Sequence, residues 1–208
     1  MATTIDALVV SGALTVGSTS ISQQTRATIL TQDANKRFPV KFTDFRVWDA
    51  AQTNLPGTAA SDDLALINGT WGTNPLLIQA GDLKAAGATT RYARCELTVP
   101  ECYDAAETFT IIISGGMKTT VADTTCTVDI EVYERDKISG ISADLCATAA
   151  TTINSLVFAD KTFTITATTL SAGDVLDCRV AITCTDAATA TAVIPTIAAF
   201  DVVCDIKG

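Results

Sequence analysis

The chain has 208 residues and a mass of 21.7 kDa, with 18% charged residues, a net charge of −9 and a mean hydropathy of +0.32. This length suits one sizeable β domain or two small ones, which can bury a core without help from disulfides or metals. The acidic balance excludes nucleic acid and anionic membranes as expected partners, because both attract clustered Lys and Arg and the basic residues here are single apart from Lys36-Arg37. No stretch approaches the roughly 20 apolar residues of a membrane span, and the N-terminus lacks a signal-peptide pattern, so we expect folding in a reducing cytosol.

The first segment sets aliphatic residues among Gly and Ser, as in LVVSGALTVGSTSIS at residues 8–22. It lacks aromatic residues, so it cannot form a core alone. We interpret residues 1–36 as an N-terminal arm and linker that becomes ordered against a partner or a symmetry mate; a flexible or strand-like leader is the alternative. The candidate partner-binding positions of the arm are its spaced aliphatic residues. These are Leu8, Val10, Leu14, Val16 and Ile21.

Residues 37–208 are predicted to form the β-sandwich domain. Its first predicted strand covers residues 37–48, where apolar and aromatic residues occur on both parities, which indicates that both faces are covered. Residues 49–87 are dense in turn residues, with short strands expected near 64–67 and 76–78. Irregular tracts of this length often carry contacts to other molecules.

Alternation is clearer from Thr90 onward. Further strands are predicted at residues 93–99, 109–113, 126–132, 163–167, 176–184 and 200–206. The strand at 126–132 turns Thr, Asp, Glu and Tyr to a wet face, and the strand at 176–184 turns Asp177, Arg179 and Thr183 outward. We expect Gly115-Gly116 to end one strand, and residues 142–154 to form a short helix or a loop. About eight strands at this spacing predict an all-β, jelly-roll-like β-sandwich with an extended N-terminal arm.

The cysteine pattern argues against metal and redox chemistry. There is no CxxC pair and no histidine, which excludes the usual mixed zinc sites and leaves no His base for a Cys nucleophile. Several cysteines share the apolar parity of their strands, so we expect buried free thiols acting as small hydrophobes, with disulfides between neighbouring strands as the alternative. The seven cysteines are Cys95, Cys102, Cys126, Cys146, Cys178, Cys184 and Cys204.

Candidate chemistry is sparse. The carboxylate groupings fit a solvated acidic face or turn-forming Asp residues, with loop-bound Ca²⁺ or glycosidase chemistry as alternatives. The groupings are Asp62-Asp63, Asp44 with Asp49, and Asp123 with Asp129, Glu131 and Glu134. Because no GxSxG elbow or phosphate loop occurs, we assign no catalytic residue, no metal site and no cofactor. Trp48 and Trp71 are expected to be core or interface anchors, with ligand platforms as the alternative.

The leader resembles the L-x-V-x-G-x-L-T-V segments of tailed-bacteriophage virion proteins, especially fibre-like and head-decorating ones. Four further stretches are similar to phage structural proteins of jelly-roll type. They are FTDFRVWDAAQTNLPGTAASDDLAL, GDLKAAGATTRYARCEL, SAGDVLDCRVAITCTD and AAFDVVCDIKG. The resemblance implies a virion component without catalytic residues: a trimeric decoration or cement protein on the capsid surface, assembled in the host cytoplasm and bound to the major capsid protein.

Two other functions remain open. A fibre or baseplate domain that binds a host glycan or another virion protein is suggested by Trp48, Trp71 and the tract at residues 49–87. An enzyme such as a glycan depolymerase is supported only by the acidic groupings. For the decoration hypothesis, positions around local three-fold axes of a shell favour a homotrimer, because symmetric copies repeat the same contacts.

Overall fold

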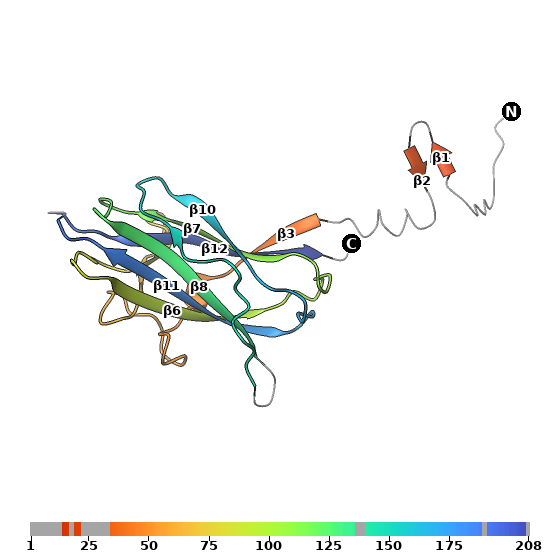
Figure 1. The fold of residues 1–208 in the computed structure, drawn as a ribbon, viewed down its shortest axis with the longest axis horizontal. Coiled ribbons are helices and arrows are strands. Elements are labelled where there is room, and N and C mark those ends of the chain that lie inside the picture. The colour runs from red at the N-terminus through yellow and green to blue at the C-terminus, as the bar shows by residue number, and fades with distance from the viewer. Residues whose placement is uncertain (1–13, 17–18, 22–33, 136–139, 189–190, 207–208) are drawn as a thin grey trace.

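A computed structural model of the chain describes residues 14–16, 19–21, 34–135, 140–188 and 191–206. Two antiparallel sheets face each other across one hydrophobic core (Figure 1). The six-stranded sheet has the order β10-β7-β12-β5-β4 with β3 also paired to β12, and the four-stranded sheet has the order β6-β11-β8-β9. The predicted all-β, jelly-roll-like sandwich is confirmed.

The strands of the body differ in length, from two residues in β9 to twelve in β12. Their bounds are β3 Ala34–Pro39, β4 Ala65–Asn68, β5 Leu76–Gln79, β6 Thr89–Thr98, β7 Phe109–Met117, β8 Thr125–Arg135, β9 Thr151–Thr152, β10 Ala159–Thr164, β11 Val175–Thr185 and β12 Pro195–Ile206. The described residues contain no α-helix; residues 142–154 form a loop that contains the two-residue strand β9. No helix among the described residues could cross a membrane.

The four-stranded sheet follows the sequence alternation closely. Along β11 every second residue is buried, from Leu176 to Cys184, and β8 buries Cys126 to Val132 in the same way. Because neighbouring side chains in a strand point to opposite faces, one parity fills the core and the other reaches solvent. Both β6 and β8 pair with β11 along nearly its whole length, which makes it the central strand.

The last strand changes parity midway. Ile197 is buried, and after a register shift between Ile197 and Ala199 the buried residues become Phe200, Val202 and Cys204. One extra residue in a bulge moves the inward positions from odd to even numbers. The period-2 pattern at 200–206 therefore describes only the second half of β12.

The first predicted strand of the body is shorter than expected. β3 ends at Pro39, and residues Phe42–Asp44 form a 3-10 helix. Its turn places Phe42 and Phe45 on the same side, with ring centroids 6.0 Å apart, and Phe45 packs edge-on against Phe200 at 5.3 Å. A spacing of three, rather than the predicted spacing of two, buries these rings.

Gly115 and Gly116 continue β7 instead of ending it. A Cβ at Gly115 would lie 3.1 Å from Ile153 Cγ2, and one at Gly116 would lie 3.0 Å from the ring of Phe158. The two glycines therefore allow the loop before β10 to cross closely over the strand, and Met117 N–H donates to Ser155 O at 2.7 Å.

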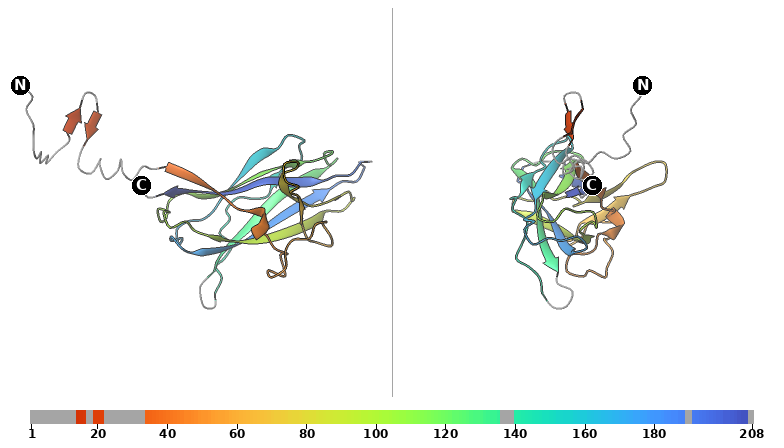
Figure 2. Two further views of the ribbon diagram at one scale, coloured as in Figure 1. Left: turned by 180° about the vertical axis from the view of Figure 1, so that it is seen from behind. Right: turned by 90° about the vertical axis from the view of Figure 1, so that its right-hand side faces the viewer.

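Part of the leader forms a small ladder. β1, Leu14–Val16, pairs antiparallel with β2, Thr19–Ile21, and neither strand belongs to a sheet of the body. Leu8 and Val10 lie outside the described residues. The body begins with β3 at Ala34, which pairs with Ile206 at the end of β12, so both strands meet at one pole of the sandwich (Figure 2).

The expectation of buried free thiols is wrong for one pair, which forms the alternative, a disulfide between neighbouring strands. Cys126 on β8 and Cys184 on β11 are directly opposite in the register and form a disulfide, whereas the other five cysteines are free. The strand assignment for both residues was correct, but their pairing depends on register, which the local pattern does not give. The disulfide closes a loop of 58 residues, which restricts the unfolded chain.

We predict that truncating the core of β11 destabilises the protein far more than truncating its outer side. Ile182 is fully buried, so Ile182→Ala should lower the free energy of unfolding by about 2–5 kcal/mol through lost apolar contact and a cavity. Thr185→Ala, on the opposite parity of the same strand, should change it by less than about 0.5 kcal/mol. Urea unfolding of both variants measures the difference, and equal losses would contradict the described orientation of β11.

We also predict the number of reactive thiols. The denatured, unreduced protein should react with a thiol reagent at five cysteines, and at all seven after reduction. The double variant Cys126→Ser/Cys184→Ser serves as the control, because its count should not change with reductant. Seven reactive thiols in the air-oxidised, unreduced protein would show that the disulfide does not form.

Candidate functional site

The outward residues of β6, β8 and β11 gather on one broad surface, which we call the outer face. The register places them in rows across the three strands, with Arg94, Arg179 and Glu131 in one row and Tyr92, Ala181 and Asp129 in the next. The outer face consists of Thr90, Tyr92, Arg94, Glu96, Thr127, Asp129, Glu131, Tyr133, Asp177, Arg179, Ala181 and Thr183, with Trp48 beside Tyr92.

The irregular tract after β3 delivers Trp48 to this surface. Arg46 and Arg94 exchange backbone hydrogen bonds of 2.7 and 3.0 Å, so the segment around Arg46 runs along the free edge of β6. Further along, Leu64 N–H donates to Tyr92 O at 2.8 Å. The tract therefore covers the edge of the sheet, which is otherwise open to pairing with another chain.

Trp48, Tyr92 and Arg179 form an aromatic–cation cluster. The rings of Trp48 and Tyr92 have centroids 5.1 Å apart, and the Arg179 guanidinium carbon lies 5.3 Å from the Trp48 centroid and 4.9 Å from that of Tyr92. The Trp48 indole N–H donates to Asp62 Oδ2 at 2.9 Å. The hydrogen bond and the cation–π contacts hold both rings in place at the surface.

Ion pairs neutralise the positive charges of the outer face. Arg94 and Arg179 are directly opposite, an arrangement that destabilises a sheet unless each charge is balanced. Arg179 Nη2 lies 2.5 Å from Glu131 Oε2, and Arg94 Nε donates to Asp177 Oδ1 at 2.6 Å. This hydrogen bond raises the pKa of Arg94 further.

A third ion pair joins the two outer strands of this surface. Arg135 Nη1 on β8 donates to Glu96 Oε1 on β6 at 2.7 Å. Arg94, Arg135 and Arg179 thus each have a carboxylate partner. Among the residues that the structure describes, Asp129 is the carboxylate of the outer face without an ion pair.

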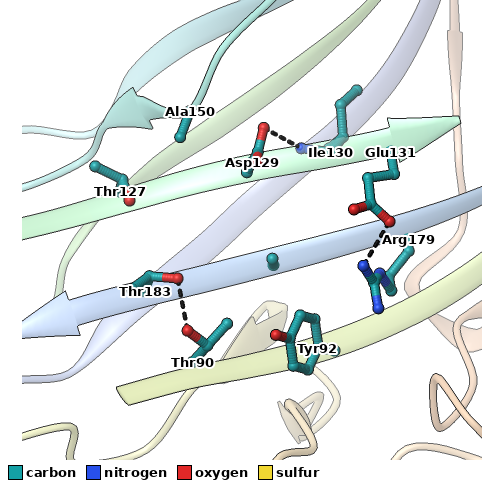
Figure 3. A pocket seen from close by; sticks show the side chains of 10 residues that line it. Thr90, Tyr92, Thr127, Asp129, Ile130, Glu131, Ala150, Arg179 and Thr183 are labelled. Carbon is teal, nitrogen blue, oxygen red and sulfur yellow. Dashed lines mark hydrogen bonds and ion pairs between the residues drawn. The ribbon is translucent and has the colours of Figure 1, made fainter. Parts of the chain in front are cut away.

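Two shallow hollows lie along the outer face. The first, of about 190 Å³, is lined by hydroxyls and carboxylates that include Thr90, Thr127 and Asp129 (Figure 3). The second, of about 300 Å³, is lined by Trp48, Tyr133 and the Arg94–Asp177 pair. Arg179 and Glu131 line both hollows, so their ion pair is the ridge between them.

Asp129 is the electrostatically unusual group of the first hollow. Partial burial raises its pKa most, and the neighbouring Glu131 and Asp144 raise it further. The N–H of Ile130, which donates to Asp129 Oδ1 at 3.0 Å, and the charge of Arg179 act in the opposite direction. The folded protein therefore disfavours the charged carboxylate at this position.

The structure separates the two tryptophans. Neither lies in the core, which leaves the interface and ligand-platform roles as predictions: Trp71 is 97% exposed in the turn between β4 and β5, and Trp48 lies half-buried at the rim of the outer face. Of the arm residues, Leu14, Val16 and Ile21 lie in the β1–β2 ladder. The contact of the arm residues with a partner stays a prediction.

The carboxylate groupings divide into turn residues and outer-face residues. Asp123 accepts hydrogen bonds from the N–H groups of Ala187 and Ala188 at 2.9 and 2.8 Å, which lowers its pKa and fixes the turn after β11. Asp63 lies near Asp62 and Asp49, and burial together with these charges raises its pKa. Among the residues that the structure describes, no three His, Cys, Asp or Glu side chains are grouped as metal ligands.

Sequence reasoning identified the outward parity of β8 and β11 but not the site itself. Tyr92 and Arg94 were not singled out. They alternate along the sequence with the inward residues Ala93 and Cys95, which places them on the solvent side of β6. What the local pattern lacks is the order of the strands. Only the pairing of β6 with β11 brings these residues beside Arg179.

No family model matches the chain, and no curated protein matches it either. Among solved structures, the chain is similar to the CBM22-1 xylan-binding domain of Paenibacillus barcinonensis Xyn10C, with 12% identity, a TM-score of 0.38, and coverage of 70% of this chain and 82% of that one. It is also similar to the xylan-binding module CBM15, with 15% identity, a TM-score of 0.41, and coverage of 84% and 100%.

A third similar structure is the Stig cyclase Fisc from Fischerella sp. TAU, with 12% identity, a TM-score of 0.41, and coverage of 83% of this chain and 90% of that one. The identities of at most 15% and the TM-scores below 0.5 make all three structures distant likenesses of this chain. The outer face must therefore be interpreted from its own residues.

We predict that Asp129→Asn stabilises the protein in a pH-dependent way. The raised pKa means that ionising Asp129 costs stability as the pH rises from its ordinary value of 3.8 through its folded value. Asn keeps the acceptor for Ile130 N–H but cannot ionise, so it should raise the Tm at about pH 7 and have little effect at about pH 3. A Tm difference that is the same at both pH values would show that ionisation is not the cause.

Proposed function

We propose that this chain is a non-enzymatic structural protein of a bacteriophage virion, a head decoration or cement protein that binds the capsid as a homotrimer. The N-terminal arm attaches the protein to its partners, and the β-sandwich forms the rigid body. The resemblance of the leader to virion proteins supports this proposal.

The observation that carries the proposal is the separate ladder within the leader. β1 and β2 pair with each other and with no strand of the two body sheets. The body has its own continuous core, formed between the two sheets. A short strand pair outside such a core leaves edges that can add to a sheet of a neighbouring subunit, where main-chain hydrogen bonds give affinity.

The body offers a further apolar contact surface for subunits. Leu156, Val157 and Phe158 are consecutive and are 57%, 74% and 37% exposed in the loop before β10. Contiguous exposed apolar side chains often mark sites of association. A protein that binds the assembled shell, and not the free shell subunits, would stabilise the shell by mass action. This is the role of a cement protein.

The disulfide is compatible with a particle that leaves the cell. Reducing conditions in the host cytoplasm oppose disulfides, whereas virion surfaces allow them to form and persist. The Cys126–Cys184 bridge would then close on released particles and tie β8 to β11.

We predict that removing residues 1–26 abolishes association with the shell while the body stays folded. Co-sedimentation with particles assembled without this chain measures binding, and circular dichroism with thermal unfolding checks the body. Within the arm, Leu14→Asp/Val16→Asp should weaken co-sedimentation strongly, because both residues share one parity of β1. Thr15→Asp, on the other parity, is the matched control, and equal binding by the truncated and full chains would contradict the role of the arm.

We predict from the same proposal that the purified full chain has three times the 21.7 kDa chain mass in light scattering. If the trimer persists after removal of residues 1–26, the arm is free to contact the capsid. If the truncated chain is monomeric, the arm joins the subunits. A full-length monomer at micromolar concentration would contradict the homotrimer.

A further inference from the structure

We propose that the outer face of the four-stranded sheet binds an uncharged oligosaccharide, with the Arg179–Glu131 pair as its central polar contact. This site goes beyond the structural function proposed above, because a virion protein needs no such site to hold a shell together. It also differs from the loop site suggested by the sequence, since Trp71 is not among the residues that line either hollow.

The shape of the surface fits an extended ligand. The two hollows lie on either side of the Arg179–Glu131 ridge, and their linings run along β11 from Thr183 to Asp177. Six residue steps along a strand span roughly 20 Å. Two adjoining shallow hollows of this combined length suit a chain of several sugar units rather than a small molecule, which is usually enclosed on most sides.

The aromatic residues suit the apolar faces of sugar rings. Trp48 and Tyr92 lie side by side, and Tyr133 lines the second hollow. Trp and Tyr present a flat apolar body and a polar tip at a wet surface, and each can contact C–H groups while its tip makes a hydrogen bond. The contact of Trp48 with Asp62 and Arg179 holds its ring in place before any ligand arrives, so little conformational entropy would be lost on binding.

The polar groups supply both donors and acceptors for hydroxyls. The ion pair with Glu131 engages Nη2 of Arg179, and a guanidinium carries five N–H donors, so donors remain for a ligand. The hydroxyls of Thr90 and Thr183 are 2.8 Å apart, and Thr127 and Asp129 line the same hollow (Figure 3). Sugar hydroxyls, which both donate and accept, can bond to each of these groups.

The balance of charge selects against an anionic ligand. Arg94, Arg135 and Arg179 are each paired with a carboxylate, while Asp129 has no such partner among the described residues. The outer face therefore carries no excess positive charge to attract phosphate, sulfate or uronate groups, and the chain as a whole carries −9. An uncharged polyhydroxyl chain is the ligand that this arrangement accommodates without displacing an ion pair.

Affinity gel electrophoresis of the full-length protein tests the proposal without any phage shell. The probes are the neutral polysaccharides xylan, dextran, laminarin and glucomannan, with alginate and chondroitin sulfate as anionic probes. We expect retardation by at least one neutral polysaccharide and by neither anionic one. Retardation by the anionic probes alone, or by none of the six, would overturn the proposal.

Paired variants locate the site. Arg179→Ala/Glu131→Ala removes both charges of the central ridge and keeps the net charge, and it should weaken binding about tenfold or more. The control Arg37→Ala/Asp160→Ala removes an ion pair of 3.1 Å on the six-stranded sheet, together with the 3.5 Å contact of Arg37 with Asp201, and should leave binding unchanged. Tyr92→Phe, which keeps the ring, should bind better than Tyr92→Ala, with thermal unfolding confirming that each variant is folded.

The same variants separate the sugar proposal from two alternatives, a glycan site elsewhere on the protein and a protein contact at the outer face. Equal weakening by both double variants would place the glycan elsewhere and overturn the inference. Loss of shell co-sedimentation in Arg179→Ala/Glu131→Ala, without any glycan binding by the parent protein, would make the outer face a protein contact and would also overturn it. Failure of the arm truncation test, in contrast, would leave this result unaffected.

Discussion

Every second residue of β11 must point into the core, and both neighbouring strands follow its register. Val180 and Ile182 fill the space between the sheets, while Arg179 and Asp177 reach the outer face. A shift of one residue would bury the arginine and expose the valine, so the register is strongly specified. The register that buries one parity of β11 in the core therefore also decides which outward side chains of β6 and β8 lie beside Arg179.

The outer face depends on this register and on one contact from outside the sheet. β6 and β8 bring Tyr92 and Glu131 to the two sides of Arg179. The tract after β3 then adds Trp48 by running along the edge of β6, where Arg46 pairs with Arg94. Residues from four separate parts of the chain meet in this way, and the aromatic–cation cluster ties a loop to the sheet that it borders.

Alternation in the sequence was enough to predict the long strands and which of their residues are buried, as in β8 and β11. Alternation could not predict the structure where the spacing of buried residues departs from two, or where segments distant in the sequence come into contact. Phe42 and Phe45 follow a spacing of three, Gly115 tolerates a close crossing by Ile153, and the Cys126–Cys184 pair follows from register. The position of Trp48 likewise depends on the edge of β6, which no local pattern reveals.

We propose that the molecule consists of an arm that attaches it to the shell and a body whose outer face stays free. Hydrogen exchange of the protein alone and bound to particles tests this division most directly. The account predicts slower exchange of the β1 and β2 amides on the particle, with unchanged exchange in the segment at residues 46–64 beside β6. Protection of residues 46–64 with no change in β1 and β2 would contradict it, because the outer face and not the arm would then be the attachment site.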